Sequence, residues 1–190
     1  MKTKIFIDGR EGTTGLRIVS RFAQRDDVEW ISIPEEKRKD PKTRSDCINA
    51  SDYTFLCLPD AAAKEAVGLV RNDHVRIIDA STAHRTAPGW AYGFPELSKE
   101  HRRQIALSNR VAVPSCYASG FAACVYPLVT SGVITPDYPV CCHAVSGYSG
   151  AGKKAIAVYE GAGRPLSYDS PRQYALSQTH KHLPEMKAVS

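Results

Sequence analysis

The sequence predicts an α/β protein whose first half is a doubly wound, mostly parallel sheet. Short apolar runs that end at turn-forming residues alternate with segments of helical periodicity, which is the pattern of βαβ units. A glycine-rich turn separates the first apolar run from the first helical segment. With 43% hydrophobic and 24% charged positions among 190 residues, the composition is ordinary for a globular chain. It excludes a disordered, collagen-like or coiled-coil protein.

The elements of the first half follow from where each apolar run begins and ends. We expect four strands, over residues 4–8, 28–33, 53–58 and 75–79. Two helices are expected between strands, over residues 13–23 and over the alanine-rich segment 60–70. Strands that alternate with helices in this way form right-handed crossovers in a doubly wound sheet.

After Ser81 the pattern becomes irregular before helices and strands return. Residues 84–97 contain two prolines and two glycines, so we expect irregular backbone there. Further along we expect a polar helix at 98–104, a strand at 111–113, a helix at 116–130, a strand at 140–145, a helix at 152–160 and mainly loop from 161 onward. Because residues 111–136 contain no Asp, Glu, Lys or Arg, we expect this stretch to be buried or to line a site. Its prolines and glycines exclude a transmembrane helix.

Charge and cysteine content limit the possible partners. The net charge is +5, but the densest basic run, 37–39, directly follows Glu35 and Glu36, so neither a nucleic acid nor a membrane is an expected partner. The chain enters an apolar strand without an export signal, which predicts a cytoplasmic protein.

Its six cysteines form no C-x-x-C pair, so we expect no disulfide and no metal site. Most of them, including Cys57 and Cys124, are expected to be buried and inert.

The glycine-rich turn has the form G-x-x-G-x-x-G, with Gly9, Gly12 and Gly15 at the junction of the first strand and first helix. Glycines at such a junction permit a tight turn, close approach of a pyrophosphate and close packing of helix on strand. The amides at the start of the helix, at Thr13 and Thr14, would face the phosphates. The spacing differs from the commoner G-x-G-x-x-G, and a glycine turn without a ligand is the alternative.

The residues after the second strand bear on the choice of dinucleotide. No acidic residue is clearly placed at the end of that strand to bind a ribose, and the basic run that begins at Lys37 follows. We therefore expect NADP rather than NAD, because a basic side chain such as Lys37 can pair with the 2′-phosphate. A solvated loop is the alternative interpretation of the same residues.

Cys116 is the candidate nucleophile. It lies where a predicted strand ends and the uncharged helix begins, within the segment 113–117. The positive end of a helix dipole favours a thiolate and lowers the pKa of a thiol, which makes the sulfur a nucleophile near neutral pH. A buried structural cysteine is the alternative at this position.

Two further motifs could take part in the chemistry. The loop 146–152 nearly matches a P-loop, but Lys154 stands where that motif needs Ser or Thr for magnesium, so we do not expect a P-loop. An anion-binding or substrate loop is favoured over the alternative of a plain turn. His180 and His182 could be half of a metal site, a general acid/base or part of a polar turn. With a thiolate nucleophile elsewhere in the chain, a nearby histidine would complete a Cys-His arrangement.

Together these motifs resemble the N-acetyl-γ-glutamyl-phosphate reductases, specifically the shorter of the two sequence types, within the aspartate-semialdehyde dehydrogenase-like group. Seven blocks follow one another in the order that the family has. They are residues 8–16, 56–60, 78–85, 92–97, 113–117, 146–152 and 180–185.

The resemblance implies a Rossmann-type NADP-binding domain at 1–114 and part of an α+β catalytic domain at 115–190, in a glyceraldehyde-3-phosphate dehydrogenase-like arrangement. It implies that Cys116 is the nucleophile and that His180 or His182 is the acid/base. Further implied site residues are Pro59 for the cofactor and Ser81, Arg85, Ser149 and Gly150 for the substrate. The resemblance also implies a homo-oligomer.

Two departures from the family pattern matter. Ser115 stands where glycine is expected before the nucleophile, so the local backbone geometry or oxyanion contacts are expected to differ. The chain ends at Ser190, whereas the family continues with more of the catalytic domain and a helix that returns to the first domain. We therefore expect a fragment or a truncated product, with apolar surface exposed.

The activity implied by the resemblance is the NADPH-dependent reductive dephosphorylation of N-acetyl-glutamyl 5-phosphate to N-acetyl-glutamate 5-semialdehyde, a reaction of arginine biosynthesis. Cys116 would form a thioester with loss of phosphate. Three alternatives stay open: the same chemistry on an aspartyl or aminoadipyl phosphate, a nucleotide-binding module without turnover, and a cofactor-free Cys-His hydrolase. The last of these conflicts with the glycine turn.

Overall fold

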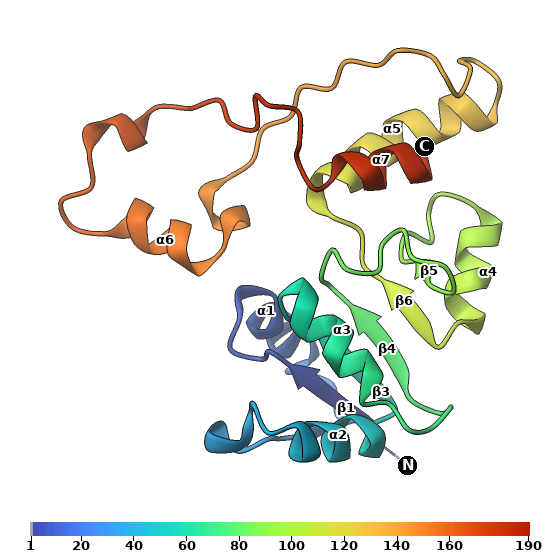
Figure 1. The fold of residues 1–190 in the computed structure, drawn as a ribbon, viewed down its shortest axis with the longest axis vertical. Coiled ribbons are helices and arrows are strands. Elements are labelled where there is room, and N and C mark those ends of the chain that lie inside the picture. Colours follow the sequence, from blue (N-terminus) through green and yellow to red (C-terminus); the bar gives the residue numbers. More distant parts are fainter. Residues whose placement is uncertain (1) are drawn as a thin grey trace.

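A six-stranded parallel sheet forms the centre of the computed structural model, which describes residues 2–190 (Figure 1). The strand order is β2-β1-β3-β4-β6-β5. The strands are β1 Thr3–Asp8, β2 Val28–Ile31, β3 Tyr53–Leu56, β4 Arg76–Asp79, β5 Ala91–Tyr92 and β6 Arg110–Ala112. The order reverses at β1, which has β2 on one side and β3 on the other, as in a doubly wound sheet. The predicted fold class is confirmed.

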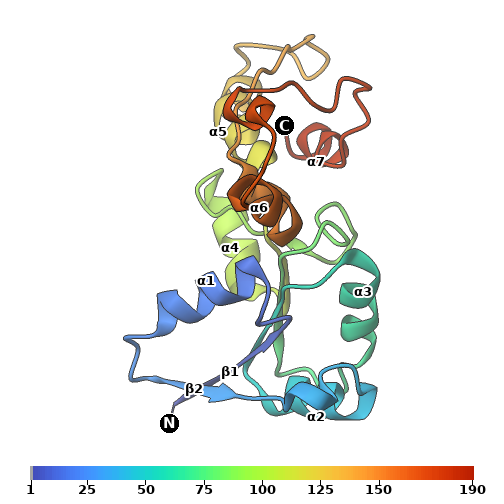
Figure 2. The same ribbon diagram turned by 90° about the vertical axis from the view of Figure 1, so that its left-hand side faces the viewer.

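Helices cover both faces of this sheet. Figure 2 shows α1 (Thr13–Phe22) on one face and α2 (Pro41–Ala50) with α3 (Asp60–Gly68) on the other. A single turn of 3-10 helix, η1 (Glu35–Lys37), precedes α2, and α4 (Lys99–Leu107) precedes β6. This arrangement requires central strands with two apolar faces.

The alternation of side chains along β1 explains the two-sided core. Ile5 and Ile7 pack with Val28 beneath α1. Phe6 points to the opposite face, where it joins Ile48 from α2 in a second cluster that includes residues of α3. Because successive side chains of a strand point to opposite faces, one strand supplies both cores.

The register of the sheet brings the ends of four strands to one line. Asp8 pairs with Leu56, Leu56 with Asp79, and Asp79 with Ala112. Since all of these strands are parallel, the segments that follow them leave the same edge of the sheet. The glycine turn, the start of α3, the loop after β4 and the start of α5 therefore lie along one edge.

Beyond the sheet, two helices and an extended arm complete the described chain. Helix α5 (Cys116–Thr130) packs against α7 (Leu183–Val189). Residues 133–179, called the arm below, reach away from these helices and carry η2 (Tyr148–Ala151), α6 (Lys153–Glu160) and η3 (Leu166–Asp169) (Figure 1). Nearly all of the arm is exposed.

One predicted strand of the second half was wrong, and two segments predicted as irregular contain short regular elements. The predicted strand at 140–145 is absent from the described residues, which show no regular structure there and nothing paired alongside it. Residues 161–190 are mainly loop, as predicted, and also contain the short helices η3 and α7. The irregular segment 84–97 includes the two-residue strand β5, because its backbone pairs in parallel with β6.

The uncharged stretch 111–136 was expected to be buried or to line a site, and burial holds for only part of it. Only Ala118 and Ala122 of helix α5 are buried, and Cys124 is exposed. The described chain leaves one side of this apolar helix uncovered, so the absence of charge does not correspond to burial here. By contrast, burial raises the pKa of Cys57 to about 12, which fits an inert thiol.

Helix α2 was not predicted, although its start carries a recognisable signal. The Asp40 carboxylate caps the helix by accepting a hydrogen bond from the Thr43 amide at 2.7 Å, and Pro41 occupies the first helical position. An acidic N-cap followed by proline is a typical helix start. Among residues 2–190, no helix is long and apolar enough to cross a membrane.

Candidate active site at the carboxyl edge of the sheet

The glycine turn after β1 is shaped by two glycines that tolerate no side chain. Gly9 has φ of +86°, and a Cβ there would lie 2.3 Å from the carbonyl oxygen of Cys57. A Cβ on Gly15 would lie 2.5 Å from the carbonyl oxygen of Arg10. The first glycine therefore permits the turn beside β3, and the last permits the close approach of α1.

The start of α1 offers free amides. Its N-cap is Gly12, no side chain caps the helix, and its first turn holds no acidic residue. The first amides of a helix have no partner within the helix, so those at Thr13 and Thr14 are placed to bind an anion. The residues present fit the pyrophosphate of a dinucleotide.

The basic run lies beside the glycine turn. Arg38 forms ion pairs with Glu11 of the turn, at 3.6 Å, and with Glu35, at 3.7 Å. Lys37 is exposed on η1. Sequence reasoning selected Lys37, whereas the structure places Arg38 in direct contact with the turn.

The end of β4 holds a buried polar network around Asp79. The Asp79 carboxylate accepts hydrogen bonds from the Ser81 amide at 2.9 Å and the Ser81 hydroxyl at 2.7 Å, and lies 2.6 Å from Nδ1 of His84. The His84 ring stacks on Trp90 with 4.1 Å between ring centroids. Ser81 is therefore held within this network at the sheet edge.

Arg85 follows this network and bridges several elements. Its Nε donates to the Val113 carbonyl at 2.9 Å and its Nη2 to the Ala80 carbonyl at 3.1 Å, while Nη1 pairs with Glu185 at 3.3 Å. These bonds use three of the five N–H groups of a guanidinium. The other two remain for a ligand.

Glu185 of α7 is a second buried carboxylate of this region, besides Asp79. It is 2% exposed and accepts hydrogen bonds from the Tyr92 hydroxyl and the Ser115 amide, both at 2.8 Å. The Ser115 hydroxyl donates to its second oxygen at 2.5 Å. Burial and the adjacent Glu185 raise the pKa of Tyr92. Sequence reasoning had placed Glu185 in a motif without assigning it a role.

Cys116 is the first residue of α5, as predicted, and its side chain is exposed. The next residue, Tyr117, packs against both candidate histidines, with ring centroids 5.7 Å from His180 and 5.8 Å from His182. Tyr174 hydrogen-bonds to the Tyr117 hydroxyl. Burial, this hydrogen bond and the neighbouring Tyr117 and Cys116 raise the pKa of Tyr174 to about 12.

The two histidines differ in their surroundings. Their rings lie 4.5 Å apart and nearly perpendicular, and Nδ1 of His180 accepts a hydrogen bond from the His182 amide at 3.2 Å. His182 is buried, and its own Nδ1 has no hydrogen-bond partner among the described residues. The pKa of His182 is lowered to about 4, mainly by burial and to a smaller extent by the neighbouring His180 and Arg85. The His182 imidazole is therefore neutral at pH 7, and its low pKa makes it a weak proton acceptor.

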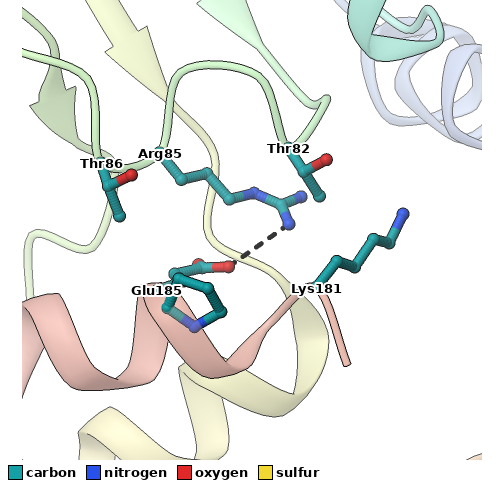
Figure 3. A pocket seen from close by; sticks show the side chains of 6 residues that line it. Thr82, Arg85, Thr86, Lys181 and Glu185 are labelled. Carbon is teal, nitrogen blue, oxygen red and sulfur yellow. Dashed lines mark hydrogen bonds and ion pairs between the residues drawn. The ribbon is translucent and has the colours of Figure 1, made fainter. Parts of the chain in front are cut away.

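A cavity of about 180 Å³ lies between the loop after β4 and the start of α7 (Figure 3). Arg85 and Lys181 supply positive charge, and Thr82 and Thr86 supply hydroxyls. The carboxylate of Glu185 also lines the cavity, with its charge paired to Arg85. Hydrogen bonds from Thr82, and the nearby positive charges, lower the pKa of Asp60 at the start of α3. The cavity suits a small anion.

Some predicted residues are not brought to Cys116. Ser149 and Gly150 lie on η2 in the arm, which Figure 1 shows apart from α5 and α7. Pro59 is the N-cap residue of α3 and lies at the same sheet edge as the glycine turn. Three further residues of this edge were part of predicted motifs but had no role of their own in the sequence analysis. They are Arg38 of the basic run and Lys181 and Glu185 of the motif 180–185.

Family models match most of the chain. Residues 27–105 match the model described as "Semialdehyde dehydrogenase, NAD binding domain", and residues 116–190 match "Semialdehyde dehydrogenase, dimerisation domain". The first match begins after the glycine turn. It supports a nicotinamide dinucleotide as the cofactor of this fold.

Curated relatives are similar along the whole chain. Proteins named N-acetyl-gamma-glutamyl-phosphate reductase from Chelativorans sp. and Mesorhizobium japonicum are 50% and 51% identical over 190 residues, which is 100% of this chain and 61% of each relative. A protein of the same name from Burkholderia ambifaria is 50% identical over 184 residues, or 96% of this chain and 58% of the relative. The chain thus spans about 60% of the length of these relatives.

Solved structures share the fold. Aspartate semialdehyde dehydrogenase II from Vibrio cholerae has a TM-score of 0.60 and 14% identity, covering 92% of this chain and 55% of that one. The enzyme from Francisella tularensis has a TM-score of 0.60 and 16% identity, covering 98% of this chain and 54% of that one. The two domain matches agree with the parallel sheet and with the similarity to curated relatives along the whole of this chain. Together they show that the chain belongs to the semialdehyde dehydrogenase family, with N-acetyl-gamma-glutamyl-phosphate reductases among its relatives.

Proposed function

We propose that this chain carries out the NADPH-dependent reductive dephosphorylation of N-acetyl-glutamyl 5-phosphate to N-acetyl-glutamate 5-semialdehyde. The observation that carries the proposal is the position of Cys116 at the start of α5, on the sheet edge that also bears the glycine turn. The names of relatives that are about 50% identical support the choice of substrate.

The cofactor site that we propose comprises the glycine turn, the first amides of α1 and the basic run. Gly9, Gly12 and Gly15, with the amides of Thr13 and Thr14, would hold the pyrophosphate. Lys37 and Arg38 would pair with a 2′-phosphate, which favours NADP, and Pro59 would line the site. The nicotinamide, when bound, supplies the hydride.

Cys116 would act as the nucleophile. Its thiol gives its proton to a neighbouring histidine, and the thiolate attacks the acyl carbon while the bond from that carbon to the phosphate oxygen breaks. Phosphate leaves and a thioester remains. Once hydride from the bound cofactor had reduced this thioester, the protonated histidine would give its proton to the acyl oxygen. The hydroxyl of the resulting hemithioacetal would pass that proton to the sulfur as the carbon–sulfur bond breaks, which restores the thiol and releases the semialdehyde.

The histidines and the cavity residues would complete the site. His180 or His182 would be the base, since both rings pack against Tyr117, the residue after Cys116. The pKa of about 4 keeps His182 neutral at pH 7 but makes it a weak base. Arg85 and Lys181 would hold the phosphate or carboxylate of the substrate in the cavity of Figure 3, with Ser81 alongside. Ser149 and Gly150 would reach the substrate only if the arm moved.

The organisation of the whole protein is part of this proposal. Residues 1–114 would form the dinucleotide-binding domain and 115–190 part of the catalytic domain, since the sheet ends at Ala112 and α5 begins at Cys116. The match to a dimerisation domain supports a homo-oligomer. The biosynthetic reaction fits a cytoplasmic protein.

Replacing Cys116 tests the chemistry. The protein, purified as its cell makes it, should reduce NADP with N-acetylglutamate semialdehyde only when phosphate is present. Cys116→Ser should lower this rate at least about a thousand-fold while NADP binding is kept. Cys124→Ser, an exposed position in the same helix, is the matched control and should leave the rate unchanged.

The other outcomes discriminate among rival functions. Full activity of the Cys116→Ser protein would contradict the thioester mechanism. Turnover with aspartate or aminoadipate semialdehyde, but not with N-acetylglutamate semialdehyde, would show that the proposed substrate is wrong. The thioester mechanism would then still stand. Binding of NADP without turnover of any of these would favour a nucleotide-binding module.

A further inference from the structure

We infer that Glu185 is a positioning residue that holds the hydroxyl of Ser115 away from the start of α5 and so leaves the amides there free to stabilise the Cys116 thiolate. The inference depends on the proposed function only in taking Cys116 as the nucleophile. It concerns residues on two distant segments of the chain, α7 and the turn after β6.

The Glu185 carboxylate uses all of its hydrogen-bond acceptor positions. One oxygen accepts from the Ser115 amide and the Tyr92 hydroxyl, and the other accepts from the Ser115 hydroxyl and Nη1 of Arg85. A carboxylate has about four acceptor positions, so this group is fully used. The pairing with Arg85 compensates the charge of a side chain that is almost wholly buried.

Ser115 is the N-cap residue of α5, but its side chain does not cap the helix. Serine at this position normally caps a helix by accepting a hydrogen bond from an amide of its first turn. Ser115 is the N-cap residue of α5, with extended φ and ψ of −76° and 157°, yet its side chain makes no capping bond. The hydroxyl donates to Glu185 instead, at 2.5 Å.

The consequence is a helix start without a cap directly beside a thiol. The first turn of α5 contains no acidic residue, and its amides keep their partial positive charge. A thiolate at Cys116, or an oxyanion formed on its acyl group, can use those amides. If Ser115 capped the helix, its oxygen would occupy one of them.

The test is the rate at which iodoacetamide alkylates Cys116 in the full chain, measured by peptide mass spectrometry between pH 5.5 and 9. Glu185→Gln removes the charge and an acceptor, so Ser115 is free to cap α5. We expect Cys116 alkylation at pH 7 to slow about ten-fold, with its pH profile moved to higher pH. Cys124, exposed in the same helix, is the internal control and should keep its rate.

A double-mutant cycle separates positioning from a general loss of structure. Ser115→Ala cannot cap the helix and keeps the bond from its amide to Glu185, so its Cys116 rate should stay within about two-fold of the original. In the Ser115→Ala background, Glu185→Gln should then change the rate by less than about two-fold. The inference would be overturned if Glu185→Gln slowed Cys116 alkylation equally with Ser115 and with Ser115→Ala. A similar slowing of Cys124 alkylation would also overturn it.

Ser115→Ala also serves if Glu185→Gln does not fold. A ten-fold slower alkylation of Cys116 in that single variant would contradict the inference, because the serine hydroxyl would then be needed for reactivity. Alkylation uses neither NADP nor an acyl phosphate. The result therefore stands independently of whether the proposed reduction is observed.

Discussion

At the scale of single residues, burial decides the protonation of the candidate base. His182 follows two exposed or half-exposed residues, and nothing in the local sequence indicates that its ring is enclosed. In the structure the ring is buried beside His180 and Arg85, which lowers its pKa from 6.5 to about 4. Its Nδ1 is buried and has no hydrogen-bond partner among the described residues.

This lowered pKa predicts a pH-dependent stability. Between pH 6.5 and about 4 the unfolded chain binds a proton at His182 and the folded chain does not, so the free energy of unfolding falls as the pH falls through this range. We expect a loss of about 1 to 2 kcal/mol from this group after solvent screening, which His182→Gln should remove. Urea unfolding at pH 7.0, 5.5 and 4.5 measures it.

The control is His74→Gln, because His74 is exposed outside the site. That variant should lose stability with falling pH as the original protein does. If His182→Gln showed the same pH dependence as His74→Gln, burial of the His182 ring would not be the cause.

At the scale of elements, a buried ion pair fixes α2 to the strand that precedes the glycine turn. Arg44 of α2 donates from Nε and Nη2 to one oxygen of Asp8, at 3.0 and 2.9 Å, and from Nη1 to Glu65 of α3 at 2.8 Å. Burial raises the pKa of Asp8, and Arg44 partly offsets that rise. Asp8 directly precedes Gly9, so the pair supports the cofactor turn.

Removing the arginine is expected to be costly. Arg44→Leu leaves the Asp8 carboxylate buried without its partner and should lower the free energy of unfolding by about 3 to 5 kcal/mol. Denaturant unfolding at pH 7 measures the loss. Adding Asp8→Asn should restore at least half of it, because the uncompensated charge is then absent.

Arg103→Leu is the matched control at this scale. Arg103 pairs with Glu100 at 2.8 Å, but both side chains are more than half exposed. Its loss should cost less than about 1 kcal/mol. Equal costs for Arg44→Leu and Arg103→Leu would show that the Asp8 pair behaves as a surface ion pair.

At the scale of the whole molecule, the described chain divides into a packed body and the exposed arm. The sheet has two cores, one on each face, whereas residues 135–151 contain none that is buried. Exposed backbone with few packed side chains opens at low free energy. The arm should therefore be the first part of the protein to be attacked by a protease.

Limited trypsin digestion checks this expectation. We expect the first cut after Arg172 in the arm, at least about ten-fold faster than any cut in the sheet. Arg76 is the internal comparison, because its guanidinium bonds to the carbonyls of Ile105, Ala106 and Ser108. First cleavage after Arg76 would contradict the division of the chain into a packed body and an exposed arm. Mass spectrometry of the fragments distinguishes the two results.

The sequence by itself determined the parallel sheet, the glycine turn and the position of Cys116 at a helix start. These features depend on local patterns: apolar runs with turn residues, glycines at fixed spacing, and the junction of a strand with a helix. The seven ordered motifs also indicated the family that the comparisons then showed. Local reasoning failed at 140–145, where an apolar run has no neighbouring strand to pair with in the described chain.

Only the tertiary structure decided which polar groups meet at the site. Glu185 lies 70 residues from Ser115, 93 from Tyr92 and 100 from Arg85, so no local pattern could reveal their hydrogen bonds. The same holds for the burial of His182 and the exposure of α5. Pairing and burial depend on which segments pack together, and that is a property of the whole fold rather than of any stretch of the sequence.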